Sequence, residues 1–155
     1  MEDLKIEYLA DRPEAVPLVA GWYFAEWGYL NPKATLERAR QKLVASMNRD
    51  AIPLTLLAVI DEEVVGAAQL KYREMPMFPE KEHWLGGVYV TPEYRGHDIA
   101  VRLVDAVLEA AQCLGVQTLH IQTERLDGGL YARLGWTPVE QVNRGPDVLV
   151  MQRAL

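Results

Sequence analysis

Short apolar runs separated by turn-forming residues recur along the chain and predict a β-sheet. The run at residues 52–60 is almost wholly apolar, and the acidic turn Asp61-Glu62-Glu63 separates it from a second run at 64–72, which is the pattern of a hairpin. The run at residues 84–90 contains Gly86-Gly87, and glycine inside a strand often marks a bulge or a close backbone approach. The expected strands are residues 4–9, 52–60, 64–72, 84–90, 116–122, 136–142 and 148–152.

Other segments repeat their apolar residues at helical spacing. The clearest example is residues 98–114. Gly115 follows this segment and can end the helix, because glycine readily takes a positive φ. One apolar face is predicted there, consisting of Ile99, Leu103, Ala106, Ala110 and Cys113. This pattern places Cys113 in the core rather than in a reactive position. The expected helices are residues 13–27, 35–47, 98–114 and 129–134.

The order of these elements is strand, two helices, three strands, helix, strand, helix and two strands. Such an order predicts a mixed α/β fold built on one central sheet. The strand–helix–strand unit at residues 88–122 predicts a parallel crossover. A length of 155 residues is typical of one domain, so we expect residues 1–155 to form a single domain.

The loop at residues 74–82 carries apolar side chains, although loops are usually polar. Met75, Met77 and Phe78 lie in a proline-containing segment without strand alternation. Apolar side chains in a loop have three common roles: they line a pocket, form a homodimer contact or pack back onto the core of the same chain. The sequence leaves these three interpretations open.

Composition excludes several classes of protein. A formal net charge of −6 argues against non-specific nucleic-acid binding, which requires a basic surface, and fits a cationic substrate weakly. A single cysteine excludes an intramolecular disulfide and a cysteine zinc site. Residues 1–7 lack the pattern of a signal peptide, and no apolar stretch approaches the ~20 residues that span a membrane. We therefore expect a cytoplasmic protein with no membrane partner.

The segment from residue 88 to residue 100 joins a strand, a tight turn at Pro92 and the start of a helix. The first amides of a helix are unpaired and carry partial positive charge, so this arrangement is an anion site. Gly96 lets the backbone approach a phosphate closely, and Arg95 adds a charged donor. The glycine motifs of ATP-binding loops and of dinucleotide-binding folds are both missing.

Two motifs lie in order along the chain. The first is Val88-Tyr89-Val90-Thr91-Pro92-Glu93-Tyr94-Arg95-Gly96-His97-Asp98-Ile99-Ala100, and the second is Tyr131-Ala132-Arg133-Leu134-Gly135-Trp136. Together they resemble the signatures of the GNAT superfamily of acetyl-CoA-dependent N-acetyltransferases, and the order of elements is similar over essentially the whole chain. The resemblance implies a mostly antiparallel sheet with the parallel strand–helix–strand crossover at the cofactor site.

The resemblance also implies an activity. The chain is expected to move an acetyl group from acetyl-CoA to a primary amine by direct attack, without an acyl-enzyme. The alternative is a non-catalytic acyl-CoA-binding sensor, or an interaction module, that retains the fold. The residues implied to bind the cofactor are Val88, Tyr89, Val90, Arg95, Gly96, His97, Asp98, Ile99 and Ala100.

Asp98 departs from the family pattern, which has glycine at this position. A carboxylate beside a pyrophosphate repels it. Asp is also a favoured N-cap residue, whose side chain accepts hydrogen bonds from the first amides of a helix. Capping by Asp98 would therefore compete with phosphate for the same amides.

The implied catalytic residues are Tyr131, Glu82 and His83. Tyr131 aligns with a tyrosine that donates a proton to the departing thiolate, and a phenol holds its proton at neutral pH. Glu82 and His83 lie where family members often place a base, and histidine titrates near neutrality. Strand amides at Val88–Val90 are implied to bind the oxyanion, with Gly86-Gly87 supplying a local distortion. The histidines show no metal-ligand spacing, so we expect no metal.

The acceptor is the least determined part of the site. The resemblance implies a pocket built from residues 22–34, 75–84 and 142–147. Aromatic side chains and Glu26 in the first of these segments would suit a cation. A small-molecule amine and a peptide amine both fit this description.

Overall fold

The computed structural model describes residues 3–155, and Met1 and Glu2 of the N-terminal segment lie outside the described residues. The elements in chain order are β1 (Leu4–Tyr8), the 3₁₀ turns η1 (Leu9–Asp11) and η2 (Pro13–Ala15), α1 (Val16–Trp27), η3 (Gly28–Leu30), α2 (Leu36–Val44), β2 (Leu54–Ile60), β3 (Glu63–Tyr72), β4 (His83–Val90), η4 (Pro92–Tyr94), α3 (Ile99–Cys113), β5 (Thr118–Thr123), α4 (Gly129–Arg133), β6 (Thr137–Asn143) and β7 (Asp147–Ala154).

The strands form one sheet in the order β1-β2-β3-β4-β5-β7-β6. Neighbouring strands are antiparallel except for β4 and β5, which are parallel and pair at Trp84 opposite His120. The helix α3 connects these two strands. The mixed α/β fold with a parallel strand–helix–strand crossover is therefore confirmed.

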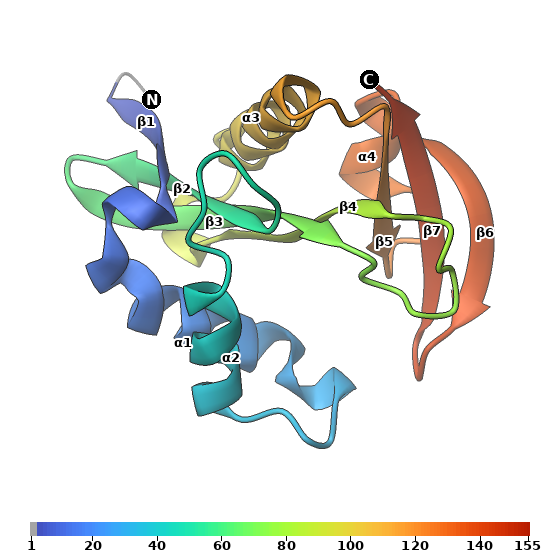
Figure 1. Ribbon diagram of the computed structural model, residues 1–155, viewed down its shortest axis with the longest axis horizontal. Coiled ribbons are helices and arrows are strands. Elements are labelled where there is room, and N and C mark those ends of the chain that lie inside the picture. Colours follow the sequence, from blue (N-terminus) through green and yellow to red (C-terminus); the bar gives the residue numbers. More distant parts are fainter. Residues whose placement is uncertain (1–2) are drawn as a thin grey trace.

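Helices cover both faces of the sheet (Figure 1). The helix α3 packs on one face, while α1 and α2 pack against each other on the opposite face. Along β2, Leu56 and Ile60 join the core beneath α3, whereas Leu57 and Val59 join the core beneath α1. Because both faces of β2 are covered, its sequence is a nearly continuous apolar run rather than an alternating one.

The two N-terminal helices are shorter than the sequence pattern indicates. The segment expected as a helix from residue 13 begins with a 3₁₀ turn, and α1 starts at Val16. The helix α2 ends at Val44 rather than near residue 47. Its start is capped, since the Thr35 hydroxyl accepts a hydrogen bond from the Arg38 amide at 3.1 Å.

The prediction for Cys113 is wrong, because this residue is exposed at the end of α3. The helix has apolar residues on more than one side, so spacing alone leaves its buried face undetermined. Contact with β2, β3 and β4 selects the stripe that is buried. That stripe consists of Ile99, Leu103, Val104, Val107, Leu108 and Ala111.

The loop between β3 and β4 packs back onto its own chain. Met75 is fully buried in a small core with Trp84, and Phe78 lies partly buried against the same core. Met77 points outward and is 51% exposed. Two of the three apolar loop side chains therefore stabilise the junction between β4 and β7 rather than line a pocket. No helix within residues 3–155 is both long and apolar enough to cross a membrane.

Candidate active site

A cavity of about 860 Å³, called here the central cavity, opens on the face of the sheet that carries α1 and α2. Side chains of α1 and α2 form one wall, β3 and β4 form the floor, and β5 with the β6–β7 turn forms the far wall. The size suits a ligand pocket, since such pockets typically measure ~300–1,000 Å³.

The floor of the central cavity is a distorted strand. Ala67 pairs with Tyr89 and Gln69 pairs with Gly86, so Gly87 and Val88 of β4 together oppose a single residue of β3. This is a β-bulge, and Gly87 adopts a φ of +59° that favours glycine. The sequence indicated a bulge or a close backbone approach at Gly86-Gly87. The bulge occurs, and the close neighbour is a side chain, because a Cβ on Gly87 would lie 2.7 Å from the Tyr23 hydroxyl.

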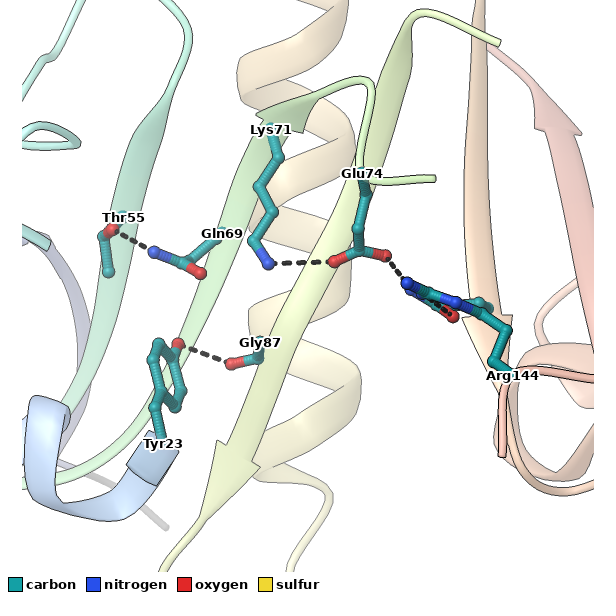
Figure 2. A network of polar contacts seen from close by, with 8 residues as sticks. Tyr23, Thr55, Gln69, Lys71, Glu74, Gly87 and Arg144 are labelled. Atoms are coloured by element: carbon teal, nitrogen blue, oxygen red, sulfur yellow. Dashed lines mark hydrogen bonds and ion pairs between the residues drawn. The ribbon is translucent and has the colours of Figure 1, made fainter. Parts of the chain in front are cut away.

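Tyr23 of α1 holds the bulge in place. Its hydroxyl donates a 2.6 Å hydrogen bond to the Gly87 carbonyl (Figure 2), a group that the bulge leaves available for a partner outside the ladder. Burial raises the pKa of the Tyr23 phenol far above its ordinary value of 10.0. Beside it, Gln69 donates to the Thr55 hydroxyl at 3.1 Å, and Thr55 in turn contacts Ser46 at 2.7 Å.

A chain of charged and amide groups crosses the cavity from β3 to the β6–β7 turn. Lys71 donates to Glu74 Oε1 at 2.8 Å, and Gln122 donates to Glu74 Oε2 at 3.0 Å. Arg144 donates to Gln122 Oε1 at 2.9 Å, which completes the chain seen in Figure 2. The Glu74 side chain is only 16% exposed, so its two oxygens are held by these partners in a largely dry position.

Tyr131 borders the same cavity from α4. Its ring meets Trp136 edge to face at 5.8 Å between centroids, which fixes its orientation. Burial, together with the negative charge of Glu74, raises the pKa of Tyr131 to about 12. The phenol therefore keeps its proton at neutral pH.

Glu74 also lies close to the bulged strand. A Cβ on Gly86 would be 2.5 Å from Glu74 Oε1, so only glycine leaves room for the carboxylate there. The bulge, the Glu74 carboxylate and the Tyr131 phenol all border the central cavity, and Glu74 is near enough for its charge to act on Tyr131.

The turn that follows β4 has the form expected of an anion site. Arg95 Nε donates to the Val90 carbonyl at 2.9 Å, and the guanidinium lies 5.5 Å from the centre of the Tyr89 ring. Gly96 has a φ of +83°, and within residues 3–155, apart from its own chain neighbours, no heavy atom lies within 4 Å of a Cβ placed on it. The loop backbone is therefore open to a phosphate, and the residues present fit a coenzyme A pyrophosphate.

The Asp98 side chain does not cap α3, although Asp is a favoured N-cap residue. Asp98 has a left-handed backbone with φ 61° and ψ 20°, and its side chain forms no capping hydrogen bond. Its carbonyl, not its carboxylate, accepts the bond from the Arg102 amide at 3.1 Å. Among the described residues, no side chain therefore competes with a phosphate for the first amides of α3.

Glu82 and His83 lie outside the lining of the central cavity. Glu82 is paired with Arg73 at 3.7 Å and lies 3.6 Å from His83 Nε2. The His83 ring packs beside Tyr72 at 5.4 Å. His97 is exposed in the turn, and His120 is buried beneath Trp84, where desolvation lowers its pKa. Within residues 3–155 there is no group of His, Cys, Asp and Glu side chains able to hold a metal ion.

Sequence reasoning missed most of the polar chain. Glu74, Gln122 and Arg144 come from three segments that are distant in sequence, and only folding brings them together. Gln69 and Lys71 did carry a signal, because polar residues that alternate with Ala68 and Leu70 in a buried strand indicate a polar lining. Of the three expected acceptor segments, 22–34 and 142–147 border the cavity, whereas 75–84 does not.

Comparison with solved structures finds the same fold in many acetyltransferases. A GCN5-related N-acetyltransferase from Kribbella flavida superposes with a TM-score of 0.75 at 20% identity, covering 99% of each chain. The PaiA N-acetyltransferase from Thermoplasma acidophilum, in complex with coenzyme A, gives 0.70 at 20% identity, covering 98% of this chain and 99% of that one. Aminoglycoside 6′-acetyltransferase type Ii superposes with a TM-score of 0.73 at 17% identity, covering 97% of this chain and 96% of that one.

A search among curated protein sequences finds no significant match. A family model does match, over residues 11–136, which is most of the chain. The matched region runs from the turn before α1 to Trp136 and includes both motifs and most of the lining of the central cavity, whereas Arg144, Pro146 and Val148 of that lining lie beyond it. This chain therefore belongs to the acetyltransferase (GNAT) family and is an acyltransferase.

Proposed function

We propose that this enzyme transfers the acetyl group of acetyl-CoA to a primary amine by direct attack, without an acyl-enzyme. The observation that carries the proposal is the meeting of Tyr131, Glu74 and the bulged strand in one cavity. The only cysteine, Cys113, is exposed at the far end of α3 from the anion turn, so it is not placed to form a thioester intermediate.

The donor would be held at the turn between β4 and α3. Backbone amides at Gly96, His97 and the start of α3 would bind the pyrophosphate, with Arg95 adding positive charge. Val88, Tyr89 and Val90 would line the path toward the cavity. The Thermoplasma acidophilum neighbour is in complex with coenzyme A, which supports this assignment at the level of the fold. When bound, the donor supplies an activated acetyl thioester.

The amine must lose a proton before it can attack, because an alkylammonium has no free electron pair. Glu74 is the carboxylate that borders the cavity beside the bulge, so we propose it as the proton acceptor, directly or through water. Glu82 and His83, which the resemblance implied for this role, would need a longer water path, since neither borders the cavity. Backbone amides at the bulge would stabilise the developing oxyanion.

Tyr131 would donate a proton to the departing thiolate. Its raised pKa of about 12 keeps the phenol protonated at every physiological pH. The Tyr131→Phe variant should lower kcat by roughly 10²-fold, the usual loss when a general acid is removed, and should leave the Kd for acetyl-CoA within a factor of two to three.

The experiment is a screen of primary amines with acetyl-CoA, read as release of free thiol. The matched control is Tyr8→Phe, because Tyr8 lies on β1 and does not border the cavity. Unchanged turnover in Tyr131→Phe would remove this residue from the mechanism. Acetyl-CoA binding without thiol release for any amine would overturn the enzymatic proposal in favour of a sensor.

A further inference from the structure

The central cavity is positively charged, although the whole chain is acidic. The chain has 16 lysine and arginine residues against 22 aspartate and glutamate residues. The cavity lining reverses this ratio, with the cations Arg38, Lys42, Lys71 and Arg144 against the carboxylates Glu74 and Glu124. A site for a polycationic acceptor would be expected to show the opposite balance.

Most of these cations have no carboxylate partner. Lys71 is paired with Glu74 at 2.8 Å. Within residues 3–155, Arg38, Lys42 and Arg144 form no ion pair, and the side chains of Arg38 and Arg144 bond only to neutral oxygen atoms. Their positive charge is therefore available to an anionic ligand.

Arg144 and Glu74 lie close enough to act on one small molecule. A single side-chain amide, that of Gln122, joins them through hydrogen bonds of 3.0 Å and 2.9 Å. An amino acid carries its ammonium and its carboxylate on the same carbon atom. A molecule of this class can present its amine to Glu74, beside the bulge and Tyr131, and its carboxylate to Arg144.

One part of the exposed cavity lining is apolar. Phe24 and Leu30 border the cavity and remain 40% and 43% exposed, and Trp27 lies between them along the chain. Exposed apolar side chains gathered at a pocket mouth indicate an apolar ligand group. Glu124 also borders the cavity and accepts a hydrogen bond from the Tyr29 hydroxyl at 3.0 Å.

We infer that the acceptor is an amine that also carries a carboxylate, in the form of an amino acid with an apolar side chain, and that Arg144 binds this carboxylate. The inference rests on the proposed function, because it names the substrate class of that same site. It replaces the weak expectation of a cationic substrate that the net charge of the chain suggested.

The test compares free leucine, leucinamide and isopentylamine, which share a side chain and differ at the carboxylate. Two quantities are measured for each: kcat/KM from thiol release with acetyl-CoA, and affinity by calorimetry with coenzyme A present. Both kcat/KM and affinity are expected to be higher for free leucine than for either analogue by at least about tenfold, the value of one charged hydrogen-bonded contact. The amine of leucinamide is less basic, so this preference would run against intrinsic reactivity.

Variants then assign the preference to Arg144. Arg144→Gln should reduce the advantage of free leucine to about twofold or less, and Arg144→Lys should restore part of it. The matched control is Arg40→Gln, because Arg40 is on α2 but is paired with Glu37 and does not border the cavity. The control should keep the full preference.

Two outcomes overturn the inference. One is an affinity for free leucine no higher than for isopentylamine. The other is an Arg144→Gln variant that keeps the preference of the unaltered protein. Absence of thiol release with every amine would instead defeat the proposed function, and the calorimetric comparison would still decide the inference.

Discussion

Asp98 occupies a backbone conformation that the family pattern fills with glycine. Its φ of 61° lies in the left-handed region, which Asp and Asn enter more readily than other residues with a side chain. The substitution of glycine by Asp is thus tolerated by the backbone. Its cost is electrostatic, because a carboxylate now stands beside amides that would bind a phosphate.

This difference predicts the behaviour of two variants at position 98. Asp98→Gly and Asp98→Asn should both raise the affinity for acetyl-CoA severalfold, because each removes the negative charge. Asn keeps a left-handed preference, so agreement between the two variants would assign the gain to charge rather than to backbone freedom. Titration calorimetry at low and high salt is the measurement, and the gain should shrink at high salt. Unchanged affinity in both variants would show that Asp98 does not oppose the phosphates.

At the scale of the element, β4 depends on Gly87. The residue combines a positive φ with close neighbours. A Cβ on Gly87 would lie 2.7 Å from the Tyr23 hydroxyl and 2.8 Å from the Gln69 amide oxygen. The bulge therefore needs both the freedom and the small size of glycine. The bulge residues Gly87 and Val88 also line the central cavity, which links a backbone detail to the proposed reaction centre.

Gly87→Ala should therefore reduce acetyl transfer by tenfold or more and destabilise the fold by about 1–3 kcal/mol. Gly115→Ala is the matched control, because Gly115 also has a positive φ, of +82°, and lies beyond the end of α3. Among the described residues other than its chain neighbours, no heavy atom lies within 4 Å of a Cβ placed on it. It should lose similar stability through backbone strain and keep its activity. Urea unfolding and thiol release measure the two effects. Full activity in Gly87→Ala would separate the bulge from catalysis.

At the scale of the whole molecule, the cavity lies where two parts of the sheet meet. The strands β1 to β4 and the strands β5 to β7 are joined through the parallel pair β4–β5, at Trp84 and His120. Tyr23 comes from the first part and Tyr131 from the second. Both phenols have raised pKa values because folding removes them from water.

This burial predicts how stability changes with pH. A phenol whose pKa is higher in the folded protein than in the unfolded chain stabilises the native state. This stabilisation is complete at pH values below the unfolded pKa of 10.0, and it is lost as the pH rises through the folded pKa. For Tyr131 the loss between pH 10 and about 12 should reach about 2 kcal/mol, since one pKa unit corresponds to ~1.4 kcal/mol.

Urea unfolding from pH 9 to pH 11.5 is the measurement. The double variant Tyr23→Phe/Tyr131→Phe should lose less stability over this range than the unaltered protein. Tyr72→Phe is the control and should behave like the unaltered protein, because Tyr72 is 45% exposed. Equal losses in all three proteins would contradict the assignment to the buried phenols.

The sequence by itself determined the order of the elements, the parallel crossover, the strand–turn–helix segment at residues 88–100 and the motif containing Tyr131. These features depend on residues that are close together along the chain, where spacing, glycine and proline act locally. The tertiary structure alone decided which face of α3 is buried, and so left Cys113 exposed. It also brought Glu74, Gln122 and Arg144 together and kept Glu82 and His83 away from the cavity. Such contacts depend on the pairing of strands distant in sequence, which local patterns do not encode.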